Sequence, residues 1–189
     1  MPKRWRRRIR SQLGGIEPGA HVSDRWAQWR RDIQLDEYHE RFERVQRSGR
    51  NSHGEADFIE GYRPGSVLDA GCGMGRVAIE LARRGFDVDG TDLDDDLLEF
   101  ARRDAPHLTW VSGSLVDVAL PRSYDIIAMP GNVMIFCRPS DRAPIVANLA
   151  NHLESGGLLV AGYSLERSAD ALTLDEYDAA CAAAGLELV

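Results

Sequence analysis

The chain has 189 residues, of which 43% are hydrophobic, and a formal net charge of −7. This length and composition suit one domain with a substantial buried core. The 3 cysteines are far apart and have no histidines at metal-ligand spacing, which argues against a disulfide framework and a zinc site, so we expect no bound metal. Since no apolar run is long enough for a membrane span or a secretory signal, a soluble, cytoplasmic protein is predicted.

Residues 1–20 are expected to form a basic, flexible arm. The cations of its first half are Lys3, Arg4, Arg6, Arg7, Arg8 and Arg10. Such a cluster on an acidic chain can bind RNA, a phosphate group or a membrane surface. A solvated terminus without fixed structure is the more common state of such a segment, and we favour it.

Residues 21–62 form the next predicted unit, a helical segment that precedes the sheet. Aromatic side chains, among them Trp26, Trp29 and Tyr38, recur between charged residues as they do in an amphipathic helix. A second, short helix is predicted over residues 55–59. The simplest interpretation is that the aromatic face packs on the sheet layer.

A strand, a glycine-rich turn and a helix are predicted over residues 66–84. Two apolar residues suit a buried parallel strand, which ends in the carboxylate of Asp69. Gly71, Gly73 and Gly75 follow, and glycine allows both a tight turn and the close approach of a ligand. The exposed amides at the start of the helix favour an electron-rich group. The segment is therefore interpreted as a nucleoside-binding turn.

The residues around this turn discriminate between two classes of cofactor. A dinucleotide-binding turn reads Gly-x-Gly-x-x-Gly, and here Arg76 stands in the place of the third glycine. Asp69 would repel a pyrophosphate and attract a cationic ligand. With this carboxylate and these glycines, the segment resembles motif I of the class I S-adenosylmethionine-dependent methyltransferases of the small-molecule type. The resemblance implies S-adenosyl-L-methionine as the cofactor. The turn residues that would contact it are Asp69, Ala70, Gly71, Cys72, Gly73, Gly75 and Arg76.

Residues 86–92 alternate as a second strand would, and this strand ends at Asp92. An acidic residue there can accept hydrogen bonds from both hydroxyls of a ribose. Asp92 and the adjacent Leu93 are therefore predicted to bind the cofactor. Helix capping is the alternative role, because Asp94 and the acids after it begin the next helix and favour its N-terminus.

A third strand is predicted over residues 108–112, and Ser114 follows it after a glycine. In the family, the residue at this place is often an aspartate that binds the adenine amino group. A serine hydroxyl can also bond adenine, so Ser114 and Leu115 are candidate cofactor contacts. A weaker adenine contact and a shifted role for Asp117 are both open.

A fourth, fully buried strand is predicted over residues 124–129. The loop after it faces the transferable methyl group in the family, so the resemblance makes Pro130 and Gly131 cofactor contacts. Asn132 is a weak catalytic candidate, and its alternative role is that of a turn residue.

The acceptor is expected to be a small molecule. The loop at Asn132 lacks the Asn-Pro-Pro-Tyr sequence of enzymes that methylate the amines of nucleic acid bases, and Cys137 lacks the preceding proline of those that methylate cytosine carbon. Nucleic acid is therefore an unlikely partner. His53, Glu55 and Asp57 are further candidates, as a general base or for contact with the sulfonium, although a histidine in a polar link is commonly a surface residue.

The remaining elements are a helix over residues 140–153, a strand over 158–163 and a helix over 174–184. Strands that alternate with helices at this spacing predict an α/β fold with a doubly wound, mostly parallel sheet. The resemblance makes residues 63–189 the S-adenosylmethionine-binding domain, of Rossmann-like methyltransferase fold. In that family an N-terminal helical segment commonly covers the cofactor, which gives residues 21–62 a second interpretation, as a lid.

The family normally ends with a sixth strand and an antiparallel seventh. Residues 186–189 look like the beginning of the sixth strand, so the sequence predicts a domain that lacks the last hairpin. The outer edge of the fifth strand would then be unpaired, which invites pairing with another chain. Formation of a homodimer and poor solubility are the two consequences that this edge suggests.

The resemblance implies transfer of a methyl group to an unidentified, small-molecule acceptor. A binding or assembly protein that keeps the fold without catalysis is the alternative, suggested by Ser114 and the missing hairpin. An NAD-dependent oxidoreductase is disfavoured by Asp69 and Arg76.

Overall fold

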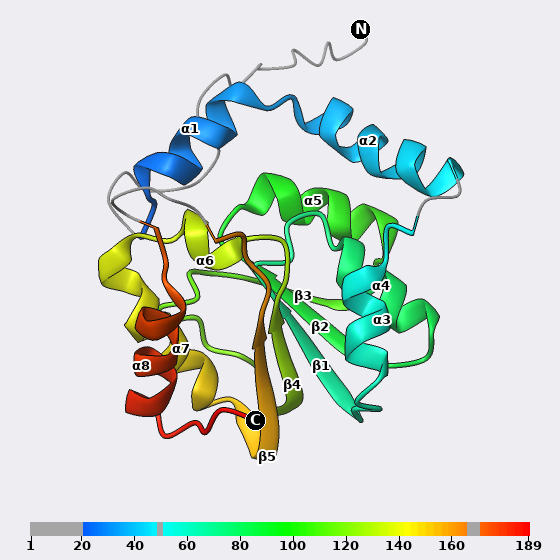
Figure 1. Cartoon of the computed structure of the whole chain (residues 1–189). Helices are drawn as coiled ribbons and strands as arrows, with labels where there is room; N and C mark the ends of the chain where they lie inside the picture. Colours follow the sequence, from blue (N-terminus) through cyan, green and yellow to red (C-terminus); the bar gives the residue numbers. More distant parts are fainter. Residues whose placement is uncertain (1–20, 49–50, 166–170) are drawn as a thin grey trace, which may run out of the picture.

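A five-stranded parallel sheet forms the centre of the molecule (Figure 1). The computed structural model describes residues 21–48, 51–165 and 171–189, so the predicted basic arm lies outside the described residues. The strands are β1 (Ser66–Ala70), β2 (Asp87–Asp92), β3 (Thr109–Ser112), β4 (Tyr124–Met129) and β5 (Leu153–Ala161). Their order in the sheet is β3-β2-β1-β4-β5, and each neighbouring pair is parallel. The predicted doubly wound sheet is confirmed.

Helices cover the sheet and one of its ends. They are α1 (Asp24–Asp32), α2 (Leu35–Arg47), α3 (Gly54–Glu60), α4 (Arg76–Arg83), α5 (Asp95–Asp104), α6 (Val133–Phe136), α7 (Pro139–Ala150) and α8 (Leu174–Ala183). In Figure 1, α3 and α4 lie on one side of the sheet and α7 and α8 on the other, while α1 and α2 run across the end at which the strands of the sheet converge. Every described helix is too short or too polar to cross a lipid bilayer.

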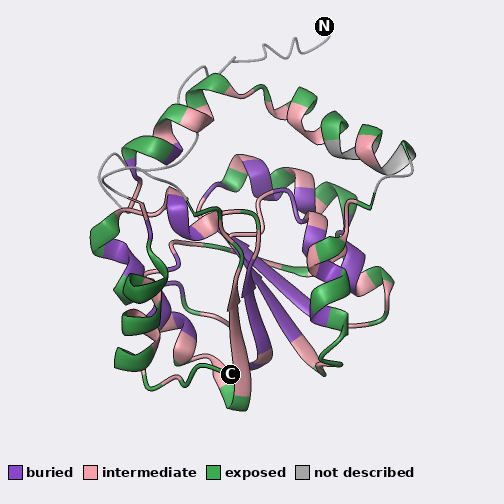
Figure 2. Cartoon of the chain, viewed as in Figure 1, coloured by how far each residue is buried: buried purple, intermediate pink, exposed green. Residues whose placement is uncertain are grey.

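The core has two parts, one on each face of the sheet. Alternate residues of a strand point to opposite faces, so Val67 and Ile126 pack toward α3 and α4, whereas Leu68 and Ile127 pack toward α7. These four side chains are at most 2% exposed. Figure 2 shows the central strands β1, β2 and β4 as mostly buried, whereas β5 is intermediate to exposed. A parallel sheet covered on both faces leaves only its carboxyl edge for a ligand.

The boundary between α7 and β5 differs from the prediction. The helix begins at Pro139, a favoured residue in the first turn, and ends at Ala150. β5 then begins at Leu153, where the sequence pattern predicted the helix to end, and the register shifts between Tyr124 and Ile126 of its neighbour. This irregularity accommodates a polar, glycine-containing stretch inside the strand, which hydropathy alone did not indicate.

The sixth strand predicted at residues 186–189 is wrong, because the structure places no strand there. Leu186 packs against the core, but Leu188 and Val189 are 87% and 97% exposed. A strand needs a neighbour to bond its backbone, and none of the described residues pairs with this segment. The outer edge of β5 also has no described neighbour, so the homodimer stays a prediction.

Gly90 of β2 is a site where a methyl group should destabilise the fold. A Cβ there would lie 2.4 Å from Cζ3 of Trp110, whose ring is held by a 2.9 Å hydrogen bond from Nε1 to the carbonyl of Ala105. Gly90→Ala should lower the free energy of unfolding by about 1–3 kcal/mol, the usual cost of overpacking, in urea denaturation. Gly54→Ala is the matched control, since nothing lies within 4 Å of the added methyl. Equal stability of the two variants would contradict this account.

Candidate functional site

A cavity of about 350 Å³ opens at the carboxyl edge of the sheet. It is bordered by the ends of β1 and β2, by the loops after β3 and β4, and by α1 and α2. The predicted site residues that line it are Asp69, Gly71, Cys72, Gly73, Arg76, Asp92, Leu93, Ser114, Leu115, Pro130 and Gly131. Two others do not line it: Ala70 is buried in the core, and Gly75 precedes α4 beneath the ring of Trp110.

The glycine turn has the backbone that its sequence requires. Gly71, Gly73 and Gly75 have φ of +76°, +55° and +80°, in the left-handed region that favours glycine. A Cβ on Gly71 would lie 2.7 Å from the side chain of Val133 in α6, and one on Gly75 would lie 2.5 Å from Trp110. At Gly71 and Gly75, both the backbone conformation and the lack of room for a Cβ require glycine. Gly71 and Gly73 line the cavity, so the turn exposes backbone atoms to a ligand there.

Asp69 carries an oxygen that has no hydrogen-bond partner among the described residues. Its Oδ2 accepts a 3.0 Å hydrogen bond from the amide of Ala78, whereas Oδ1 is buried and accepts none. Burial raises the pKa of this carboxyl to about 7. A buried acceptor with half of its bonding capacity unused fits a cationic group that enters the cavity.

Asp92, at the end of β2, accepts a hydrogen bond from the glycine turn. Its Oδ2 accepts from the amide of Gly73 at 2.7 Å, and its Oδ1 accepts from the amide of Asp94 at 2.9 Å. Burial raises the pKa of Asp92 to about 6. The cap of α5 is Asp94, which accepts from the amide of Asp96 at 2.9 Å, so Asp92 is not the capping residue. A carboxylate has further lone pairs, which leaves Asp92 able to accept from ribose hydroxyls.

Ser114 lines the cavity with its hydroxyl in a local turn. Its Oγ accepts a 3.3 Å hydrogen bond from the amide of Val116. Asp117, the alternative for the adenine contact, is exposed and is not among the lining residues. The hydroxyl proton of Ser114 stays available for an acceptor atom on a ligand.

Comparison with known proteins identifies the family. The sequence model of a protein family described as a methyltransferase domain matches residues 67–157 of the chain. A solved structure, of a TehB-like S-adenosylmethionine-dependent methyltransferase from Corynebacterium glutamicum, is 33% identical and superposes with a TM-score of 0.74, covering 82% of this chain and 84% of that one. The chain belongs to the S-adenosylmethionine-dependent methyltransferases. The alternative of an NAD-dependent oxidoreductase is thereby set aside.

Two curated relatives act on small molecules. The dTDP-3-amino-3,4,6-trideoxy-alpha-D-glucopyranose N,N-dimethyltransferase of Streptomyces venezuelae is 31% identical over 108 residues, which are 56% of this chain and 46% of the relative. The magnesium-protoporphyrin O-methyltransferase of Rhodobacter capsulatus is 30% identical over 148 residues, 71% of this chain and 64% of the relative. The chain thus spans from about half to just under two thirds of the length of these relatives.

Arg76 connects the glycine turn to α3 through an ion pair and hydrogen bonds. Its guanidinium donates to both carboxylate oxygens of Glu55, at 2.7 and 3.2 Å, and to the carbonyl of Ser52. Burial works to raise the pKa of Glu55, but the hydrogen bonds from Arg76 outweigh it and the net shift is downward. Glu55 is thus held as the ionic partner of Arg76 and is not among the residues that line the cavity.

The predicted catalytic candidates lie outside the cavity. His53 lies with its Nε2 3.9 Å from a carboxylate oxygen of Glu80, and Asp57 pairs with Arg84 at 2.8 Å. Asn132 has a left-handed φ of +74°, and its Oδ1 accepts from the amide of Ser164 at 2.7 Å, which is a turn role. None of the three candidates is among the residues that line the cavity.

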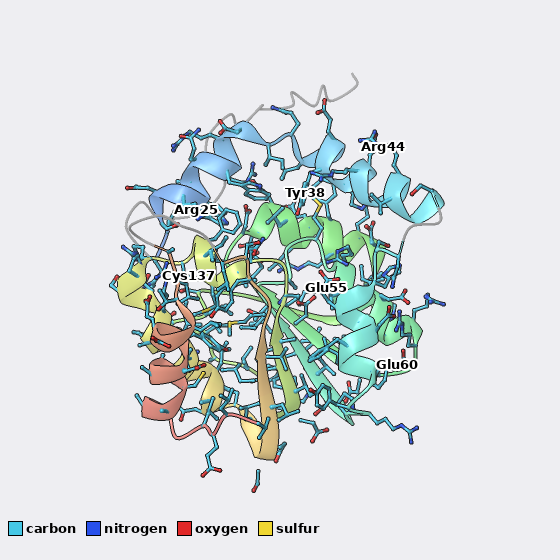
Figure 3. All side chains as sticks on the ribbon, in the orientation of Figure 1. Arg25, Tyr38, Arg44, Glu55, Glu60 and Cys137 are labelled. Carbon is cyan, nitrogen blue, oxygen red and sulfur yellow. The ribbon has the colours of Figure 1, made fainter. Side chains whose placement is uncertain are left out.

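The N-terminal helices supply walls that no motif indicated as site residues. Trp26, Trp29 and Tyr38 line the cavity, and the rings of Trp29 and Tyr38 meet edge to face with centroids 5.5 Å apart. In Figure 3, Tyr38 lies on the side of α2 that faces the sheet domain, whereas Arg44 lies on the opposite side. The spacing of the three aromatic residues was visible in the sequence as an amphipathic pattern. Such a pattern does not distinguish a helix face that packs in the core from one that faces a ligand.

Arg30 forms ion pairs that connect α1 to the start of α5, beside the cavity. Its Nε is 2.8 Å from Asp94 and its Nη2 is 2.6 Å from Asp96, and the side chain of Asp94 is 2% exposed. Arg30→Ala should raise the dissociation rate of S-adenosylhomocysteine about tenfold, since a charged hydrogen bond of this kind contributes about 1.5–3 kcal/mol. Stopped-flow fluorescence measures this rate. Arg31→Ala is the control, because Arg31 bonds Gln28 within its own helix. An unchanged rate for Arg30→Ala would show that α1 does not retain the ligand.

Proposed function

We infer that this chain binds S-adenosyl-L-methionine in the cavity and transfers its methyl group to a small-molecule acceptor. The observation that carries this proposal is the buried, unpartnered Oδ1 of Asp69 beside the glycine turn. The named activities of the relatives, which methylate an amino sugar and a porphyrin, support a small molecule as acceptor.

Each end of the cofactor has a matching group in the cavity. The ammonium group of the amino acid end fits Asp69, at the glycine turn. The ribose diol fits Asp92, and the adenine fits the hydroxyl of Ser114 with Leu93 and Leu115 as apolar walls. The pyrophosphate of a dinucleotide would instead meet two buried carboxyl groups, which is unfavourable.

The chemistry needs little from the protein beyond position. The cofactor supplies a methyl group that its sulfonium already activates. Trp26, Trp29 and Phe136 give the cavity aromatic walls. Alignment of donor and acceptor by such walls supplies much of the rate enhancement in reactions of this kind. A base is needed only where the acceptor must lose a proton.

Calorimetric titration of the protein with S-adenosylmethionine and S-adenosylhomocysteine tests the proposal. We expect saturable binding of one equivalent, lost in Asp69→Ala. NAD, titrated in parallel, should not bind. Absence of binding by folded protein would overturn the proposal, and binding without methyl transfer to any of a broad set of acceptors would favour a non-catalytic binding protein.

A further inference from the structure

A histidine and an aspartate from distant parts of the chain meet at the wall of the cavity. His21 precedes α1, Asp141 lies in the first turn of α7, and both line the cavity. Nδ1 of His21 is 3.3 Å from Oδ2 of Asp141. Neither residue belongs to the motifs that hold the cofactor.

The short helix α6 contacts both the glycine turn and the segment that carries His21. Val133, its first residue, packs where a Cβ on Gly71 would lie. Phe136, its last residue, accepts a hydrogen bond at its carbonyl from the hydroxyl of Ser23, two positions after His21. Since a helix rises about 1.5 Å per residue, α6 spans roughly 5 Å between its contact with the glycine turn and its contact with the segment that carries His21.

Asp141 is built to stay ionised. It is 8% exposed, and its carboxylate accepts from Nε of Arg138 at 2.9 Å and from the hydroxyl of Ser140 at 3.2 Å. Burial works to raise the pKa of Asp141, but the bonds from Arg138 and His21 outweigh it and the net shift is downward. An ionised carboxylate only accepts, so Nδ1 of His21 donates their hydrogen bond. In the neutral imidazole with this tautomer, Nε2 is the acceptor.

We propose that His21, oriented by Asp141, is the general base of this enzyme, and that its acceptor substrate is a ring-bearing compound with an acidic hydroxyl group, such as a phenol. This rests on the proposed function. His21 is the catalytic residue, and Asp141 is a positioning residue that acts through it.

The lining of the cavity on this side selects the acceptor class. Trp26, Trp29 and Phe136 give it aromatic walls, which stack well on a planar ring. The negative charge of Asp141 is already engaged by Arg138 and His21. Among the described residues on this side of the cavity, the carboxylate of Asp141 is thus already paired and is not available to an ammonium group. Nε2 of His21, in contrast, can accept a hydrogen bond from a neutral hydroxyl.

The step balances without any further reactant. The acceptor O–H bond breaks, and its proton goes to Nε2 of His21. The acceptor oxygen forms a bond to the methyl carbon as the carbon–sulfur bond breaks, and that electron pair stays on sulfur. The sulfonium becomes a neutral thioether, and the imidazolium of His21 later releases its proton to water.

Other titratable and charged groups lie around His21 and belong in the test. Burial raises the pKa of the neighbouring Cys137 to about 12, so this thiol stays protonated at neutral pH. Arg25 packs over the ring of Phe136. On the cofactor side, Asp69 and Asp92 titrate near pH 7 and 6, so only a comparison of variants isolates His21.

Ionisation of 4-nitrophenol on the S-adenosylhomocysteine complex tests the proposal, because this complex holds no methyl group to transfer. We expect the bound phenol to ionise about one pH unit below the free phenol, a roughly tenfold gain in phenolate, read from phenolate absorbance. His21→Gln should remove the shift while S-adenosylhomocysteine still binds, and Asp141→Asn should reduce it. His39→Gln is the matched control, since His39 pairs with Asp104 at 2.5 Å and does not line the cavity.

Each outcome decides a different point. Failure of S-adenosylhomocysteine to bind the native chain would refute the proposed function itself. Binding of S-adenosylhomocysteine with no binding of 4-nitrophenol would refute the acceptor class. An equal shift in the native chain and His21→Gln would refute the base, and if His21→Gln does not fold, an unreduced shift in Asp141→Asn would do so.

Discussion

Replacement of Asp92 by alanine should abolish measurable binding of S-adenosylmethionine. The carboxylate accepts hydrogen bonds from the amides of Gly73 and Asp94, and it is the group that we assign to the ribose. Loss of a charged acceptor costs about 1.5–3 kcal/mol for each bond, so the dissociation constant should rise at least about a hundredfold. Isothermal titration calorimetry at neutral pH measures it.

Asp95→Ala separates this effect from a general loss of negative charge. Asp95 lies three residues further along, in the first turn of α5, and its side chain is 57% exposed. Its contact with Arg102 is long, at 3.4 Å, so the variant should bind S-adenosylmethionine like the native chain. If Asp92→Ala also keeps native affinity while it remains folded, Asp92 does not contact the cofactor.

The part of the site that lies within one short segment could be predicted from the sequence. Asp69, the three glycines and Arg76 are near neighbours in the chain, and their spacing fixes a turn whose backbone only glycine adopts readily. Asp92 was found because parallel strands end at the same edge. These predictions needed only local geometry and the alternation of strands with helices.

The pair of His21 and Asp141 could not be predicted in this way. The two residues are 120 positions apart, and neither follows a strand of the sheet. Their meeting depends on how α1 lies across the sheet end and on the bond from Ser23 to the carbonyl of Phe136. Hydropathy and spacing carry no information on such packing. His53, which the sequence made a candidate base, instead lies beside Glu80.

The lack of information on tertiary packing in a sequence pattern also explains the errors near the C-terminus. Residues 186–189 have the composition of a strand, but β-propensity reports on side chains that pack against neighbours. Leu188 and Val189 have none among the described residues and are exposed. The start of β5 was missed for the converse reason, because pairing with Tyr124 overrides a polar and glycine-containing sequence.

Asp69→Asn should stabilise the ligand-free protein at pH 8 and at the same time remove its affinity for S-adenosylmethionine. In the folded chain, burial raises the pKa of Asp69 to about 7, against about 3.9 in an unfolded chain. Between these values the unfolded state has released its proton while the folded state retains it. The free energy of unfolding therefore falls as pH rises through this window.

The size of the effect follows from the same shift. A rise of about three pKa units corresponds to roughly 4 kcal/mol of destabilisation above pH 7. An asparagine does not titrate, but its buried amide N–H groups lack a partner, which costs about 1–3 kcal/mol. Asp69→Asn should therefore be more stable than the native chain by about 1–3 kcal/mol at pH 8. It should be equal or less stable near pH 4, where the native carboxyl is protonated.

Urea denaturation of both chains at the two pH values measures this difference, and Asp92, which is present in both, largely cancels from it. A variant that is less stable than the native chain at both pH values would show that the charge of Asp69 is compensated within the fold. The carboxylate would then be structural rather than a site for the cationic end of the cofactor. If instead Asp69→Asn is the more stable chain at pH 8 but not at pH 4, and also loses binding, the charge of Asp69 destabilises the ligand-free fold. The ammonium group of the cofactor then neutralises that charge.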